Sequence, residues 1–499
     1  MPGTLTVPSA PALARLGRPM ANNGLRRPQA AALARPLQFN WVVGMLVLHA
    51  LLGVVFKHSG AVATLHALGT LFFGLYLAFR RRPMFHLACW SMYAAGAEVL
   101  WRMAGAHLNW EYGKYAVSLV LFIRLLGGGL KTIYWTPVIY FMLLMPAVLP
   151  TILLSYSPHQ FEDVRSLLSF NLSGPLSVLA CSLFFSRVHL TDLSTRRLVV
   201  WMLLPIAGIA GATLSGLTSL EHLEFGGGSS FLASGGFGPN QVSGFLGMGA
   251  FFAALLALDP RLNLRLRLVF LVLVLWFAAH AALSFSRTGI YIFGTGLAAA
   301  LPFSPIRNLF RPKTVVLVAL AIGIGLVTWA FLMRYTEGKI GERFSSTSLT
   351  RRDLIAAQDI ALWKKNVVLG AGVGSSSIAH SEATAGRIGA HTEYTRLLAE
   401  HGLLGAIAAL LLLKMAARPL FTMPRGFTKG ALLGGTGMTL LWMAASAMRN
   451  AAPGLLIGLA AAHFSRLRPR VSKPPATTAA PAPLPSRRRS IARSRPNAS

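Results

Sequence analysis

The sequence has few charged residues and very few acidic ones. Only 12% of its 499 residues are charged, with 47 Lys and Arg against 15 Asp and Glu, whereas 54% are hydrophobic. Apolar runs such as 39–56 and 314–331 approach the roughly 20 residues that cross a bilayer. A soluble domain rarely combines so many apolar residues with so few charged ones, so we predict a polytopic membrane protein.

Cysteine is also scarce. Cys89 and Cys181 are the only two, and each lies within an apolar run where a small hydrophobic residue is the usual occupant. This scarcity excludes a disulfide framework and a cysteine-ligated metal site. Internal and inverted repeats are not recognisable either, which disfavours the common transporter architectures.

The formal net charge of +32 raises the question of nucleic acid as a partner. However, Lys and Arg fall in the short connections and in both tails, as the positive-inside rule produces, so nucleic-acid binding is the weaker interpretation. The basic connections 80–82, 261–267 and 307–313 fall on one side together with the tails. We therefore expect both termini in the cytoplasm and the segment 334–392 on the outer side.

These patterns predict an all-α fold, a transmembrane helical bundle with about 12–14 spans and one large outer loop. We expect a basic cytoplasmic tail (1–38), transmembrane helices (39–333), the outer loop (334–392), C-terminal transmembrane helices (393–466) and a disordered basic tail (467–499). The candidate spans are 39–56, 60–79, 84–104, 114–130, 133–154, 167–186, 198–217, 240–258, 267–284, 288–303, 314–333, 393–416, 429–446 and 450–465.

The polar segment 334–392 stands out because most other apolar runs are joined by short connections. A loop of this length and polarity in a compact protein usually carries function. It holds cationic charge on the side where the positive-inside rule would not place it, which favours an anionic ligand. The residues concerned are Arg334, Arg343, Arg351, Arg352 and Arg387.

Two further charges, each at or within a span, are candidates for function. Arg287 opens a span in the turn Ser286-Arg287-Thr288-Gly289. An arginine near bilayer depth is costly unless it meets an anion, carbonyls or water, and its guanidinium fits phosphate oxygens; simple snorkelling is the alternative. Glu98 is a candidate acid/base group or ion-pair partner.

His391 is the candidate base. Thr392 is a plausible N-cap and Glu393 a favourable first-turn acid, so we expect a helix to begin just after His391. The positive end of that helix favours a neutral imidazole, which is the form that accepts a proton. A histidine that merely caps the entrance to a span is the alternative.

Two other kinds of site are disfavoured by spacing. His380, Glu382, His391, Glu393 and His401 cluster in sequence, but their spacing does not place them on one helix face as metal ligands, so we expect no metal and no cofactor. The run Gly-Ala-Gly-Val-Gly at 370–374 lacks the Gly-Lys-Ser/Thr of a nucleotide loop. It predicts a tight turn or a close backbone approach instead.

At these residues the chain resembles the O-antigen ligase and O-antigen polymerase superfamily of bacterial membrane glycosyltransferases. The resemblance covers roughly 226–413. It comprises Pro239-Asn240 at the entry to a span, the Ser-Arg-Thr-Gly turn, Arg352 followed by Leu-Gly-x-Gly-x-Gly at 369–374, and a His-x-Glu-Tyr signature that begins at His391. The family usually has His-Asn at the start of this signature, whereas this chain has Thr392 after His391. It also has Thr395 where an aliphatic residue is common. Both departures concern the acceptor.

The resemblance implies a metal-independent transferase that moves a glycan from undecaprenyl diphosphate to an acceptor hydroxyl, on the outer side of the bacterial inner membrane. Its partners would be the lipid-linked glycan, lipid A core or a growing polysaccharide, and membrane lipids. The implied catalytic residues are His391, Arg287 and Arg352. Binding of the diphosphate or glycan is assigned to Arg334, Arg343, Arg351, Arg387, Glu393 and Tyr394.

Four functions remain open at this point. A ligase to lipid A core is preferred over a polymerase of O-antigen or exopolysaccharide, and both would use the same donor. A protein O-oligosaccharyltransferase is a third possibility. A transporter of a lipid-linked anion is the fourth, and the single large outer loop and the lack of repeats speak against it.

Overall fold

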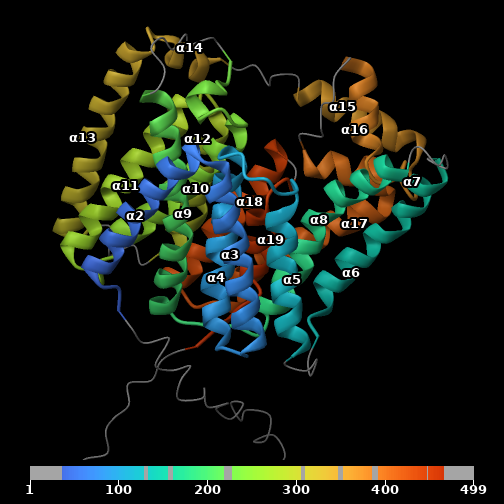
Figure 1. Ribbon diagram of the computed structural model, residues 1–499, viewed down its shortest axis with the longest axis horizontal. Coiled ribbons are helices and arrows are strands. Elements are labelled where there is room, and N and C mark those ends of the chain that lie inside the picture. Colours follow the sequence, from blue (N-terminus) through green and yellow to red (C-terminus); the bar gives the residue numbers. More distant parts are fainter. Residues whose placement is uncertain are drawn as a thin grey trace, which may run out of the picture. The chain divides into compact units, whose positions relative to one another are not determined.

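The computed structural model describes residues 36–127, 133–154, 161–218, 228–304, 310–346, 352–384, 392–446 and 448–465. Every predicted apolar segment corresponds to a helix or a helix pair (Figure 1). In chain order these are α2 (Phe39–His58), α3 (Gly60–Phe79), α4 (Met84–Met103), α5 (Tyr112–Leu126), α6 (Trp135–Leu144), α7 (Val148–Leu154), α8 (Phe161–Phe185), α9 (Asp192–Thr218), α10 (Pro239–Leu258), α11 (Leu264–Leu283), α12 (Arg287–Ala300), α13 (Pro312–Tyr335), α17 (Glu393–Thr422), α18 (Phe427–Ala445) and α19 (Ala451–Leu459).

Within the described residues, nine helices are long and apolar enough to cross a membrane. They are α2, α3, the α6–α7 segment (Trp135–Leu153), α8, α9, α10, α11, α13 and α17. The protein is therefore an all-α multi-pass membrane protein, as predicted. Helices α4, α5, α12, α18 and α19 match the remaining predicted spans and are shorter or less apolar.

Small residues bring the central helices close together. A Cβ on Gly53 of α2 would lie 1.9 Å from the backbone oxygen of Gly208 on α9, and a Cβ on Gly211 would lie 2.2 Å from that of Ala50. Because lipid is as apolar as a helix surface, such close van der Waals packing is a main source of helix association in membranes. Helix α2 consequently runs along α9 over much of its length (Figure 1).

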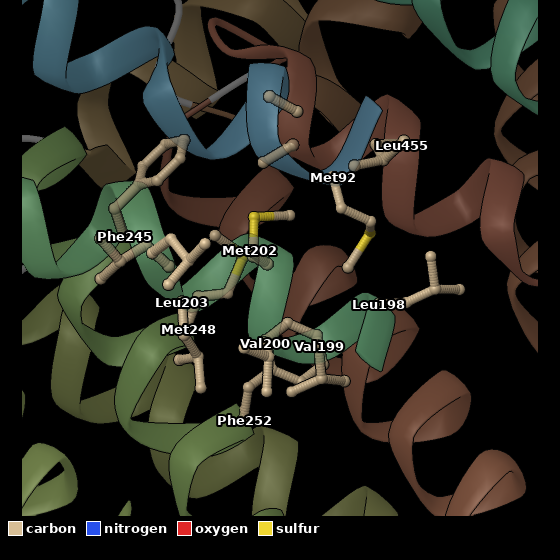
Figure 2. Packing of buried hydrophobic residues seen from close by; sticks show 14 of the residues in the cluster. Met92, Leu198, Val199, Val200, Met202, Leu203, Phe245, Met248, Phe252 and Leu455 are labelled. Atoms are coloured by element: carbon tan, nitrogen blue, oxygen red, sulfur yellow. The ribbon is translucent and has the colours of Figure 1, made fainter. Parts of the chain in front are cut away.

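The main apolar core lies where α4, α9, α10 and α19 meet. Figure 2 shows Met92 of α4 and Met202 of α9 filling the space between Phe245 of α10 and Leu455 of α19. All four side chains are almost fully buried. Flexible Met side chains fit the irregular gaps between helices that cross at different angles.

A buried ion pair joins two distant parts of the chain at one end of this core. Arg102 donates to Glu98, one turn earlier on α4, at 2.5 Å, and also to Oδ1 of Asn450 at 3.0 Å. The second oxygen of Glu98 accepts the backbone N–H of Ala451 at 2.6 Å. Of the two roles considered for Glu98, the structure shows the ion pair, which joins α4 to the start of α19.

The described part of the long polar segment is largely helical. It contains α14 (Lys339–Ser345), α15 (Arg352–Lys365) and α16 (Ser375–Thr384). Ile340 and Phe344 of α14 belong to a small apolar cluster with Phe285 and Leu332, at the ends of α11 and α13. This cluster holds α14 over the turn between α11 and α12.

Helix α17 is broken at Gly402, whose φ of 60° and ψ of −139° are not helical. The break releases the carbonyls of Ala399 and Glu400 from their helical partners. The N–H groups of Ala371 and Gly372 donate to these carbonyls at 2.9 and 3.2 Å, and Leu403 N donates to the Val367 oxygen at 2.9 Å. The segment between α15 and α16 thus completes the hydrogen bonding of a membrane helix.

The glycine run 370–374 makes this junction possible. Gly370, Gly372 and Gly374 have φ values of 73°, 100° and 86°, which favour glycine. A Cβ on Gly370 would lie 2.3 Å from the backbone of Glu400. The predicted tight turn with a close backbone approach is confirmed.

A short parallel pairing was not expected from the sequence. Strand β1 (His189–Leu190) pairs with β2 (His463–Phe464) and ties the connection before α9 to the segment after α19. Two-residue strands leave no recognisable alternation in a sequence.

Candidate functional site

A cavity of about 600 Å³ lies at the end of the bundle where α10 and α12 begin and α18 ends. Its walls come from the first turns of α12, the last turn of α14, the start of α15 and the end of α18. The lining residues include three arginines, two threonines, an asparagine and a tyrosine. They are Asn240, Arg287, Thr288, Tyr291, Arg343, Arg352 and Thr392.

The turn that carries Arg287 is rigidly held. Phe285 has a φ of 55°, a rare conformation for a bulky residue, and its side chain is fully buried. Ser286 Oγ donates to Oδ1 of Asn240 at 2.7 Å, and Ser243 Oγ donates to the Ser286 oxygen at 2.9 Å. These contacts fix the first residue of α12 against α10.

Gly289 permits this close contact between α10 and α12. Its N–H donates to Ser243 Oγ at 3.0 Å. A Cβ at this position would lie 2.2 Å from the backbone oxygen of Ser243. The last residue of the Ser-Arg-Thr-Gly turn is therefore glycine for a steric reason.

Two of the arginines also connect the α12 turn to α14. Arg287 Nη1 donates to the backbone oxygen of Ser346, and Arg343 Nε donates to the Phe285 oxygen at 3.0 Å. Each arginine thus donates to a carbonyl of the opposite element. Both arginines therefore hold this junction and also line the cavity.

The three arginines repel one another. Burial lowers the pKa of Arg352, and the positive charges of Arg287 and Arg343 lower it further. Burial and then Arg287 likewise lower the pKa of Arg343. Among the described lining residues Asp353 is the one carboxylate. An anion in the cavity would therefore gain from a preorganised positive field.

Three of the predicted site residues do not line this cavity. Arg334 is exposed in the last turn of α13. Tyr394 OH donates to the Leu440 oxygen at 2.9 Å and faces α18. Glu393 is fully buried, and its carboxylate accepts from Arg396 at 2.5 Å and from the backbone N–H of Met448 at 3.2 Å.

The predicted start of α17 is confirmed, and it explains why Glu393 turns away from the cavity. Thr392 is the N-cap, and its hydroxyl accepts from Thr395 N at 3.2 Å. Successive residues on a helix differ by about 100° in direction, so Thr392 can line the cavity while Glu393 does not. Arg396 also donates to Glu400 at 2.7 Å, which makes a buried three-residue ion network at the base of α17.

A second buried carboxylate links the helices of the polar segment to α17. Asp359 of α15 accepts from Thr395 Oγ1 at 2.6 Å and from Ser376 Oγ at 2.5 Å. His380 Nε2 lies 3.1 Å from the same carboxylate. Asp359 is only 1% exposed, so this cluster fixes α15 and α16 on α17.

His391, Arg351 and Arg387 lie outside the described residues. The residues that follow two of them in sequence, Arg352 and Thr392, both line the cavity. Over the described part of the chain, no group of three or more His, Cys, Asp or Glu residues is arranged to hold a metal ion.

The sequence prediction did not single out Tyr291, Thr288 or Asp359. Tyr291 follows Arg287 by four residues, a spacing that places both on one face of a helix, so this signal was available. Nothing in the sequence distinguished Asp359 from an exposed acid on a polar helix.

No protein-family model matches the chain, and no curated protein matches its sequence.

Proposed function

We propose that this protein is a glycosyltransferase of the O-antigen ligase or polymerase type in the bacterial inner membrane. The observation that carries the proposal is the convergence of Arg287, Arg343 and Arg352, from three separate helices, on one cavity of about 600 Å³. Such a cluster at the end of a membrane bundle suits a diphosphate that is attached to a lipid.

The reaction would use this positive charge on the leaving group. The acceptor oxygen forms a bond to the anomeric carbon of the donor sugar, and the bond from that carbon to the diphosphate oxygen breaks. The electron pair leaves with the diphosphate, whose growing charge the three guanidiniums stabilise. No proton transfer to the leaving group is needed.

The proton of the attacking hydroxyl would go to His391. Thr392, the next residue, lines the cavity as the N-cap of α17, which supports this role for the preceding position. The positive end of α17 favours the neutral imidazole that accepts a proton.

The proposal includes an orientation. The basic connections indicate that both termini are cytoplasmic and that the helices α14–α16 are periplasmic. The acceptor is lipid A core in the preferred version, and a growing polysaccharide in the alternative.

The test is complementation of a deletion strain with wild type, His391→Ala or Arg287→Ala, followed by gel analysis of surface glycans. Both variants should abolish transfer and still insert into the membrane. The matched controls are His107→Ala and Arg334→Ala, which change exposed residues that do not line the cavity. Glycan at the wild-type level in either cavity variant would overturn the assignment.

The same gel separates the two enzymes. A ligase defect leaves full-length polymer on the lipid carrier and none on lipid A core. A polymerase defect leaves only single repeat units. Unchanged glycans in the deletion strain would instead favour the protein acceptor or the transporter.

A further inference from the structure

A second cavity, of about 470 Å³, lies between α2, α3, α4 and α9. Most of its wall is apolar, with Phe73, Leu77, Trp90 and Trp201 among the lining residues. Gly69 is exposed and Phe73 is 54% exposed, so the cavity opens sideways between helices toward the bilayer. A cavity of this composition and opening suits a hydrocarbon chain.

Three of its polar lining residues, His49, His66 and Tyr93, are joined in a chain of hydrogen bonds. The indole N–H of Trp101 is a donor only, so Nδ1 of His66 accepts it, at 2.9 Å. Nε2–H of His66 then donates to Tyr93 OH at 2.9 Å, Tyr93 donates to Nε2 of His49 at 3.0 Å, and Nδ1–H of His49 donates to the Met45 oxygen at 2.7 Å. In this chain one nitrogen of each imidazole donates and the other accepts, so both imidazoles are neutral.

One end of the cavity is cationic. Arg197 lines it and also lines an adjoining cavity of about 410 Å³ with Gln38 and Trp41, at the start of α2. Trp41 and Trp201 lie next to each other there, with ring centres 5.8 Å apart. A cation beside tryptophans at the end of a membrane helix is typical of the headgroup level of a bilayer.

We propose that this groove binds an anionic phospholipid, with one acyl chain in the 470 Å³ cavity and the phosphate beside Arg197. The lining residues of α3 run from His66 to Leu77, a rise of about 16 Å, which fits one acyl chain. An undecaprenyl chain is several times too long. This cavity and the arginine cavity have no lining residue in common, so the two sites are separate.

The test uses the full chain in nanodiscs of phosphatidylcholine with a small fraction of phosphatidylglycerol that carries a diazirine at the end of one acyl chain. Light should attach the lipid to residues of α3 or α4. Gly69→Leu should reduce this labelling to background, because a Cβ on Gly69 meets no atom within 4 Å and the added side chain enters the cavity without a clash. Gly44→Leu on α2 is equally free of clashes and lies outside the cavity, so it should label as wild type.

The headgroup is tested with Arg197→Gln. Preference here means the ratio of labelling by the phosphatidylglycerol probe to labelling by a phosphatidylcholine probe with the same diazirine. This ratio should be about fivefold lower in the variant than in wild type, because that is the effect of one basic residue at an anionic surface. Arg265→Gln removes an exposed arginine elsewhere and should keep the preference.

Equal labelling of Gly69→Leu and Gly44→Leu would overturn the cavity as the chain site. Equal labelling by the two lipids in wild type would overturn the charge recognition. Competition by undecaprenyl phosphate but not by phosphatidylglycerol would overturn the proposed occupant. None of these results depends on glycan transfer.

Discussion

Arg287, Arg343 and Arg352 are separated by up to 65 residues, yet their side chains share one cavity. The sequence placed all three among the candidate site residues. Arg343 and Arg352 were chosen because cationic charge on the predicted outer side is unusual, and Arg287 because an arginine near bilayer depth is costly. It also included Arg334, which the structure places outside the cavity. Charge type was readable from the sequence, whereas the direction of a side chain was not.

Arg352→Gln should lower the rate of glycan transfer by about 10²-fold or more, as expected for the loss of one preorganised donor. It should also raise the melting temperature by about 1–2 °C, because the mutual repulsion of the arginines is relieved. Transfer from purified lipid-linked donor and thermal unfolding in detergent measure the two effects. Arg334→Gln is the control and should change neither; a fall in both rate and melting temperature for Arg352→Gln would instead indicate a structural role.

The lowered pKa values of Arg343 and Arg352 have a definite sign for stability. A cation whose folded pKa lies below its unfolded pKa binds fewer protons when folded, so stability increases as pH rises between the two values. At a pH below both pKa values, the loss of folding stability caused by these charges is fully present. The cost of these charges therefore persists throughout the neutral range, and an added anion should reduce it.

Glu393→Gln should destabilise the protein by roughly 3 kcal/mol, because it breaks a buried ion pair and leaves Arg396 partly uncompensated. Chemical unfolding in detergent measures this loss. The control is Glu342→Gln, whose exposed pair with Lys339 should contribute little. If Glu393 contacts substrate instead, the variant would keep its stability and lose affinity for the donor.

At the scale of elements, long apolar helices were predictable to within a few residues. The nine long apolar helices of the described residues were predictable because one rule, burial of about 20 apolar residues in lipid, dominates there. Helices α14–α16 were not predicted, since they are short and their positions depend on tertiary contacts: α14 packs at the ends of α11 and α13, and α15 and α16 pack on α17. The glycine run 370–374 was recognised as a turn, but its partner, the break at Gly402, was not.

Gly289→Ala should separate α12 from α10, since the new Cβ would lie 2.2 Å from the Ser243 oxygen. We expect a loss of about 1–3 kcal/mol and a strong fall in transfer, because the turn that carries Arg287 must shift. Gly294→Ala, on the same helix, meets no atom within 4 Å and should behave as wild type in both assays. Equal behaviour of the two variants would contradict the steric role of Gly289.

For the whole molecule, the proposed orientation can be tested with cysteine labelling. Cys89 and Cys181 are buried, so both should be unreactive in the folded protein. A membrane-impermeant maleimide added to spheroplasts should label Lys365→Cys, at the end of α15, and not Arg82→Cys, after α3. Both positions are exposed, so accessibility to solvent is matched. The opposite labelling pattern would reverse the orientation, and would place the arginine cavity on the cytoplasmic side.

The contact of Glu98 with the N–H of Ala451 spans 353 residues, and this separation has a consequence for biosynthesis. At a synthesis rate of roughly 5–20 residues per second, α4 enters the membrane about 20–70 s before α19 exists. During that time Glu98 and Arg102 can already pair with each other, because their i,i+4 spacing on α4 brings them within reach at once. The nascent chain can therefore carry two opposite charges through the translocon as a nearly neutral unit, and the seam beside α4 is closed only when the last helix arrives.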